Sequence, residues 1–131
     1  MNRSAEDYIK TIYTLKMKHG CVHSVDVAHE LGFSKASVSV AMANLREKNI
    51  IEMKKNGEIE FTENGNKLAA VIYERHSILS GFLQKVAGVD EKTASADACR
   101  IEHFISDSTY SGIKKFVRNA GEYVYKEENE A

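Results

Sequence analysis

Proline is absent from the 131 residues of this chain. Because proline is the residue that most strongly interrupts an α-helix, long helices can form here without a break. Apolar residues also recur every three or four positions over several long stretches, which is the period of a helix with one buried face. The sequence therefore predicts a mainly α-helical fold. Its 43% hydrophobic content is enough for a core, and its length suits one domain with a small appendage.

The stretch from Ser24 to Arg46 predicts a helix-turn-helix. Ser24 is expected to cap a short helix that Gly32 ends, and Ser34 is expected to cap the helix that follows. Two short helices around a glycine-containing turn, the second beginning with small polar residues, are typical of a DNA-binding helix-turn-helix. Helical hairpins without a DNA-binding role share this pattern.

A small β-hairpin is predicted directly after these helices. Ile50–Met53 and Ile59–Thr62 are short strand-like runs, and the Asn-Gly pair between them favours a type I′ turn. A hairpin that follows a recognition helix is a wing, and Lys54 and Lys55 at its tip would reach DNA phosphate groups. The alternative is a solvated hairpin with ordinary surface lysines.

The distribution of charge permits DNA binding without requiring it. The net charge is −1, but residues 33–56 hold five Lys or Arg against two acids. From residue 63 onward acids exceed bases by eleven to nine. A mildly basic first half is compatible with a double-stranded DNA partner.

Cys99, Glu102 and His103 predict part of a transition-metal site. Their i, i+3 and i+4 spacing places them within an arc of about 100° on a helix expected to run from Asp90 or Thr93 through Ile105. Such a group needs further ligands from another element. The candidates are His76, on a long helix predicted for residues 63–86, and Asp7, on the first helix.

Each of these residues also has a structural interpretation. A buried cysteine is often a small hydrophobic residue, and Glu102 has Arg100 or solvent as alternative partners. A lone histidine such as His76 is often a satisfied surface or core residue, and Asp7 alone would be an ordinary helix N-terminal acid.

Five motifs resemble the metal-dependent repressors of the diphtheria toxin repressor and manganese transport regulator family. They run from Glu6 to Tyr13, Ser34 to Ser39, Phe61 to Gly65, Glu74 to His76 and Asp97 to His103. The resemblance covers roughly residues 4–120 and suggests the short form without an SH3-like domain. It implies a winged helix-turn-helix over residues 1–63 and a helical metal-binding and dimerisation domain over 64–121. The polar and acidic composition of residues 122–131 predicts a tail.

The resemblance also implies a function and a set of site residues. Members of the family bind Fe²⁺ or Mn²⁺ and, as homodimers, repress metal uptake genes at a palindromic operator. The family's metal-ligand positions correspond to Asp7, His76, Cys99, Glu102 and His103. On the recognition helix and wing, the expected DNA contacts are Ser34, Lys35, Ser37, Ser39, Val40, Lys54 and Lys55.

The metal-ligand positions combine two types of family member. Cys99 matches the iron type, whereas Asp7 matches the manganese type. A thiolate favours Fe²⁺, with Zn²⁺ or Co²⁺ as further ions in vitro, while carboxylates suit Mn²⁺, so Fe²⁺ is weakly favoured.

Three departures from the family concern a second metal. Lys10 replaces a metal-binding carboxylate of the manganese type, and Ser80 and Ser95 replace ancillary ligands of the iron type. A single metal per chain is therefore expected, with the Lys10 ammonium where a second cation would sit. The alternative is that Lys10 merely pairs with Glu6 one turn away.

Two other classes of function remain as rivals. An enzyme would use Cys99 as nucleophile and His103 as base, but no oxyanion donor is evident, so no enzyme is expected. A winged-helix regulator of another kind would answer a small organic ligand or a redox signal, with Cys99 and His103 structural. No run is apolar enough to span a membrane, and two distant cysteines suggest no disulfide framework, so a cytoplasmic location is expected.

Overall fold

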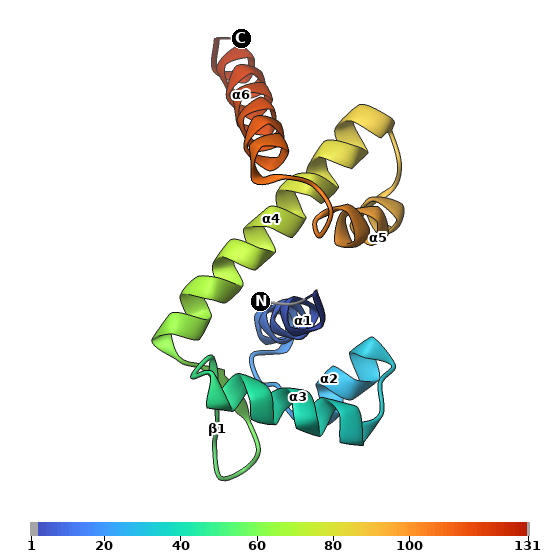
Figure 1. Ribbon diagram of the computed structural model, residues 1–131. Coiled ribbons are helices and arrows are strands. Elements are labelled where there is room, and N and C mark those ends of the chain that lie inside the picture. Colours follow the sequence, from blue (N-terminus) through green and yellow to red (C-terminus); the bar gives the residue numbers. More distant parts are fainter. Residues whose placement is uncertain (1–2, 131) are drawn as a thin grey trace. The chain divides into compact units, whose positions relative to one another are not determined.

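The structure, a computed structural model, describes residues 3–130, and it describes side-chain environments for residues 3–119. This part of the chain forms six helices and one two-stranded hairpin (Figure 1). In chain order they are α1 (Arg3–His19), α2 (Ser24–Leu31), α3 (Lys35–Glu47), β1 (Ile51–Met53), β2 (Ile59–Phe61), α4 (Glu63–Ala87), α5 (Glu91–Ile101) and α6 (Asp107–Glu130). The prediction of a mainly helical fold with a small hairpin is confirmed.

Two compact units divide the chain, Met1–Tyr73 and Glu74–Ala131, so α4 contributes its first part to one unit and its second part to the other. Among the described residues, no helix combines the length and the apolarity that a bilayer span requires.

The first unit packs α1, α2, α3, the hairpin and the start of α4 around one core. Its fully buried side chains come from every one of these elements, and Ala69 is the one from α4. The largest are Ile9, Ile12, Val27, Val38, Met42, Ile51 and Ile59. The antiparallel register pairs Ile51 with Phe61 and Met53 with Ile59. The predicted helix-turn-helix followed by a hairpin is thus present.

Local capping signals set the helix-turn-helix, with one correction. Gly32 ends α2 in the left-handed region at φ 67°, and the Ser34 hydroxyl accepts a hydrogen bond from the Ser37 N–H at 3.1 Å. The prediction that Ser24 caps α2 was wrong, because Ser24 is its first helical residue and His23 is the N-cap. The His23 N–H donates to the Asp26 carboxylate at 2.8 Å, as in a capping box.

The turn of the hairpin differs from the predicted type I′ turn. The Gly57 N–H donates to the Lys54 carbonyl at 2.9 Å, and the Lys54 N–H donates to the Glu58 carbonyl at 2.9 Å. Of the Asn-Gly pair only Gly57 has a positive φ, at 87°. The loop therefore has three residues, 55–57, in which a turn is followed by a left-handed glycine. It needs one residue with positive φ, whereas a type I′ turn needs two.

The second unit packs α5 and α6 against the later part of α4. Leu79, Ala94 and Ala98 are fully buried, and the rings of Phe82 and Phe116 meet edge to face at 6.2 Å. The Lys114 ammonium donates to the Glu74 carboxylate at 2.7 Å. This hydrogen bond and charge lower the pKa of Glu74, so the pair between α4 and α6 stays ionised.

Two helix ends in this unit differ from the predicted ones. The helix expected to reach Ile105 ends at Ile101, where a turn begins with the Phe104 N–H bonded to the Ile101 carbonyl at 3.0 Å. The chain turns here because Ser106 caps α6 by accepting from the Thr109 N–H at 3.1 Å. The helix expected to end near Ala120 continues to Glu130, through a sequence rich in helix-forming Glu and Lys.

Gly65 provides a test of how α4 leaves the hairpin. A methyl group built at Gly65 would lie 1.8 Å from the Ile50 carbonyl oxygen, so the backbone would have to move. We expect Gly65→Ala to lower the free energy of unfolding by about 3 kcal/mol, measured by urea denaturation. The matched control is Gly81→Ala on the same helix, where a methyl group meets nothing within 4 Å. It should leave stability unchanged or raise it by up to about 1 kcal/mol; equal losses in both variants would contradict this packing.

Candidate functional site

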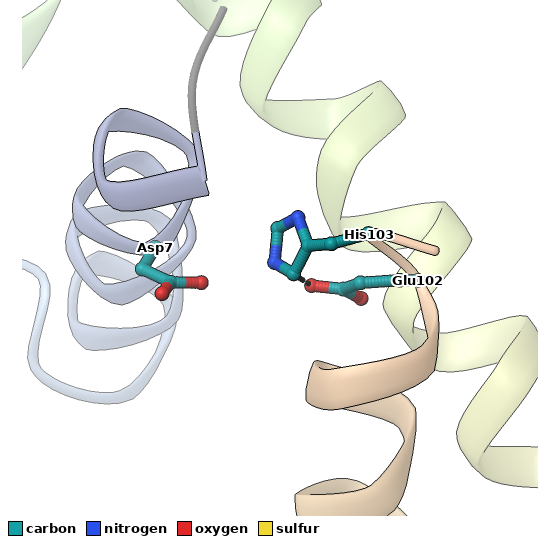
Figure 2. A group of neighbouring side chains, drawn as sticks. All are labelled: Asp7, Glu102 and His103. Atoms are coloured by element: carbon teal, nitrogen blue, oxygen red, sulfur yellow. Dashed lines mark ion pairs between the residues drawn. The ribbon is translucent and has the colours of Figure 1, made fainter. Parts of the chain in front are cut away.

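The turn after α5 carries two of the predicted metal ligands. Glu102 keeps helical dihedral angles, φ −59° and ψ −23°, and its N–H bonds to the Ala98 carbonyl, whereas His103 lies in the turn beyond. The His103 Nε2 atom is 3.5 Å from Glu102 Oε1 (Figure 2). Glu102 is only 8% exposed, so its carboxylate depends on partners inside the protein.

His76 approaches the same carboxylate from α4. Its Nδ1 atom lies 3.3 Å from Glu102 Oε2, and its Nε2 atom lies 3.1 Å from the Ser95 hydroxyl on α5. The second unit therefore brings His76 together with Glu102 and His103, which follow it by 26 and 27 positions in the sequence. Two imidazoles around one carboxylate form a donor set that suits divalent first-row metal ions.

Ser95 gives this cluster a partner that sequence reasoning treated only as a missing ligand. A hydroxyl both donates and accepts, so it bonds to the His76 Nε2 atom whichever ring nitrogen carries the proton. When Nε2 carries the proton, the Nδ1 lone pair faces the Glu102 carboxylate, where a metal ion would be bound. A hydrogen bond of this kind orients a ligating imidazole.

Arg75 holds the turn that carries Glu102 and His103, and sequence reasoning assigned it no role. Its guanidinium donates to the backbone carbonyls of Glu102 at 3.1 Å and Ile105 at 3.4 Å, and it pairs with Asp107 at 3.3 Å. The guanidinium carbon also lies 4.8 Å from the centre of the Tyr110 ring. A signal was available in the sequence, since Arg75 adjoins His76 in one of the recognised motifs.

The two remaining predicted ligands are described each within its own helix. Cys99 is half-buried on α5, one turn before Glu102. Asp7 belongs to α1 in the first unit, where the Lys10 ammonium lies 3.8 Å from its carboxylate. Lys10 thus pairs with Asp7, one turn before it on the same helix. Metal binding by Cys99 and Asp7 remains a prediction.

The predicted DNA contacts on α3 lie on the exposed side of that helix. All five side chains expected to meet DNA are exposed, whereas Val38, Met42 and Leu45 face the core. The five are Ser34, Lys35, Ser37, Ser39 and Val40. The Ser34 hydroxyl already caps α3 and lies 2.9 Å from the Ser37 hydroxyl, so it is partly committed to the helix itself.

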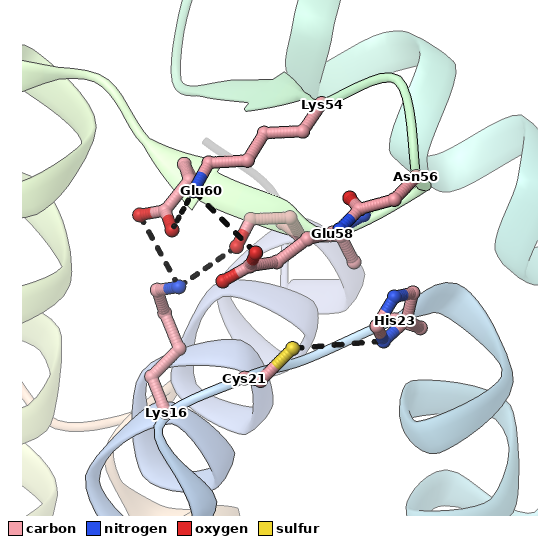
Figure 3. Close-up of polar contacts among 8 residues, drawn as sticks. Lys16, Cys21, His23, Lys54, Asn56, Glu58 and Glu60 are labelled. Carbon is pink, nitrogen blue, oxygen red and sulfur yellow. Dashed lines mark hydrogen bonds and ion pairs between the residues drawn. The ribbon is translucent and has the colours of Figure 1, made fainter.

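On the hairpin, the two predicted phosphate contacts differ from each other. Lys55 is exposed, and no ion pair within the described residues involves it. The Lys54 ammonium lies 3.4 Å from a carboxylate oxygen of Glu58 and 3.4 Å from one of Glu60 (Figure 3). Cys21, to which the sequence assigned no role, lies nearby with its sulfur 3.9 Å from His23 Nδ1.

Two protein-family models match successive parts of the chain. The family model described as the iron dependent repressor N-terminal DNA binding domain matches residues 1–59. The model described as the iron dependent repressor metal binding and dimerisation domain matches residues 62–126.

Individual relatives agree with these matches. The chain is 30% identical over 118 residues to an uncharacterized HTH-type transcriptional regulator of Methanocaldococcus jannaschii, covering 89% of this chain and 94% of that protein. It is 34% identical over 116 residues to the transcriptional regulator MntR of Escherichia coli O157:H7, covering 88% of this chain and 74% of MntR.

Solved structures share the fold. The structure of the metal-dependent transcriptional regulator MtsR superposes with a TM-score of 0.79 at 24% identity, covering 90% of this chain and 55% of MtsR. The chain thus spans about half the length of that protein. Because both family models match and together cover almost the whole sequence, this chain belongs to the iron-dependent repressor family of DNA-binding transcriptional regulators.

Proposed function

We propose that this protein is a metal-activated repressor that binds DNA as a homodimer and controls genes of metal homeostasis. The observation that carries the proposal is the cluster of His76, Glu102 and His103, in which two imidazoles surround a buried carboxylate within 3.5 Å. A cluster of this kind, in a chain that also has a winged helix-turn-helix, supports a switch in which metal binding controls DNA binding. We infer that it acts in the cytoplasm and has no catalytic role.

The proposed ligand set extends this cluster to Asp7 and Cys99. His76, Glu102 and His103 would hold the ion together with the Cys99 thiolate from α5 and the Asp7 carboxylate from α1. A divalent ion supplies the positive charge that a buried carboxylate and a thiolate need. Because Asp7 belongs to the DNA-binding unit, a shared ligand set would couple the two units. A coupling of about 1–3 kcal/mol is sufficient for a switch.

The metal we propose is Fe²⁺, with Mn²⁺ as the alternative. Two carboxylates suit Mn²⁺, but a thiolate such as Cys99 is a softer ligand that favours Fe²⁺. Zn²⁺ and Co²⁺ should also bind in vitro, because affinity for a site with nitrogen and sulfur ligands rises along the first-row series.

The proposed DNA interface uses α3 in the major groove and the hairpin as a wing. In a homodimer the two α3 helices would face successive major grooves of a palindromic operator. Short hydroxyls and the exposed Val40 imply modest direct reading of bases, so DNA shape and phosphate contacts contribute much of the recognition. We assign residues 1–63 to DNA binding, 64–121 to metal binding and dimerisation, and 122–131 to a polar tail.

The main test is metal-dependent DNA binding under anaerobic conditions. We expect Fe²⁺ or Mn²⁺ to tighten binding to DNA from the protein's own promoter at least about tenfold, roughly 1.4 kcal/mol, by fluorescence anisotropy. Glu102→Gln should lose this gain because it removes the charge between the two imidazoles. Glu91→Gln, an exposed position in the first turn of α5, is the matched control. Tight binding that is indifferent to metal in the wild type would contradict the proposal.

The number of metal ions provides a second test. We expect one ion per chain, because Lys10 places an ammonium beside Asp7 and serines replace the ancillary ligands. Equilibrium dialysis followed by elemental analysis should give a ratio near one for the wild type. Lys10→Glu should raise it toward two, whereas Lys18→Glu, at an exposed position near the end of α1, should leave it unchanged. A wild-type ratio near two would refute the single-site prediction.

Arg75 provides a third test, which concerns the turn rather than the ligands. Arg75→Ala removes the donors that hold the carbonyls of Glu102 and Ile105, at a cost of about 1.5–3 kcal/mol. We expect faster hydrogen exchange at the Phe104 and Ile105 amides in metal-free protein, and metal affinity reduced about tenfold. Arg100→Ala is the control, since Arg100 is exposed and, within the described residues, forms its ion pair with Asp97 at 3.7 Å. Unchanged hydrogen exchange in Arg75→Ala would show that the turn does not depend on the hydrogen bonds of Arg75.

A further inference from the structure

The wing presents its two lysines in different electrostatic states. The Lys54 ammonium has two carboxylate neighbours, Glu58 and Glu60, each at 3.4 Å. The charge of Glu58, followed by hydrogen bonds to both carboxylates, raises the pKa of Lys54. Lys55, the next residue, is exposed and joins no ion pair within the described residues.

One of the two carboxylates beside Lys54, that of Glu60, is held from the base of the hairpin. Lys16 of α1 pairs with Glu60 at 3.3 Å (Figure 3) and donates to the Ile59 carbonyl at 2.8 Å. The Ile59 N–H bonds to the Val22 carbonyl at 2.8 Å. Partial burial alone would raise the pKa of Glu60, but Lys16 and then Lys54 outweigh it and lower this pKa. Glu60 is therefore tied to α1, and the Glu58 side chain is only 16% exposed, so neither carboxylate is a fully solvated surface charge.

A phosphate group that approaches Lys54 must compete with the two carboxylates for the Lys54 ammonium. A lysine that contacts DNA replaces its counterions with phosphate, and the released counterions provide much of the binding free energy. Lys54 already has carboxylates in place of free counterions, so a phosphate contact must first separate it from them. The carboxylates of Glu58 and Glu60 would also repel the phosphate.

We propose that Glu58 and Glu60 mask Lys54 by competing with DNA phosphate for its ammonium, so that Lys55 is the main phosphate contact of the wing. This proposal rests on the proposed DNA-binding function. It assigns unequal roles to two lysines for which the sequence predicts the same role. Glu58 is the sharper test residue, because Glu60 also pairs with Lys16 at the base of the wing.

The experiment is a double-mutant cycle on Lys54 and Glu58. Full-length wild type, Glu58→Gln, Lys54→Gln and the double variant are titrated with a fluorescein-labelled duplex of arbitrary sequence over a range of salt concentrations. We expect Glu58→Gln to tighten binding about two- to fivefold, the range of an exposed ion pair. In the Lys54→Gln background most of this gain should disappear, because Glu58 acts through Lys54.

The matched control is Glu52→Gln. Glu52 lies on β1 opposite Glu60, is exposed, and carries the same charge on the same hairpin, whereas the ion pairs of Lys54 within the described residues are with Glu58 and Glu60. It reports the general effect of removing one negative charge near DNA. Lys55→Gln should lower the slope of log affinity against log salt by about 1, and Lys54→Gln should lower it by clearly less.

The outcomes separate this proposal from the function on which it rests. Duplex binding in which Glu58→Gln equals Glu52→Gln, or in which the two lysine variants change the salt slope equally, would overturn the masking proposal alone. Absence of binding by the Mn²⁺-loaded wild type, to this duplex and to the promoter DNA alike, would overturn both. Amide spectra of each variant show whether the Lys54 N–H keeps its bond to the Glu58 carbonyl, so a hairpin that has lost its shape is recognised.

Discussion

The arrangement of the second unit depends on the buried carboxylate of Glu102. An ionised carboxylate that is 8% exposed costs several kcal/mol unless cationic or hydrogen-bonding groups surround it. His76 and His103 supply the side-chain partners, and Arg75 binds the backbone carbonyl of the same residue. The early end of α5 is part of this arrangement, because it places His103 in a turn beside Glu102 and not further along a helix.

Features with a local physical cause were predictable from the sequence. Gly32 ends α2 because only a left-handed residue continues the chain there, and Ser34 caps α3 through its own hydroxyl. Helical geometry also predicts that Cys99 and Glu102, at i and i+3, lie on the same face. His76 was a candidate ligand from the residues alone, and the motif resemblance added that it stands at a ligand position of the family. No local rule connects it to Glu102, which lies far away in sequence.

Features that depend on tertiary partners were not predictable in the same way. The end of α5 is set by the Ser106 cap and by the Arg75 bonds across from α4, which helical periodicity does not contain. Ser24 looked like a cap, but the Asp26 carboxylate three residues after His23 determines the start of α2. Lys54 and Lys55 have the same chemistry, and only the fold shows that two carboxylates adjoin the first of them.

The metal cluster and the wing share one physical principle. In each, a charged group proposed to bind a partner already has an opposite or hydrogen-bonding group inside the protein: imidazoles beside Glu102 and carboxylates beside Lys54. Binding is then an exchange of partners. Its free energy is the difference between the free energy of the contacts to metal or DNA and that of the internal contacts they replace. Such a difference is small, which suits a regulator that must release both metal and DNA. It also makes binding sensitive to geometry, since a ligand that fits less well than the internal partner does not displace it.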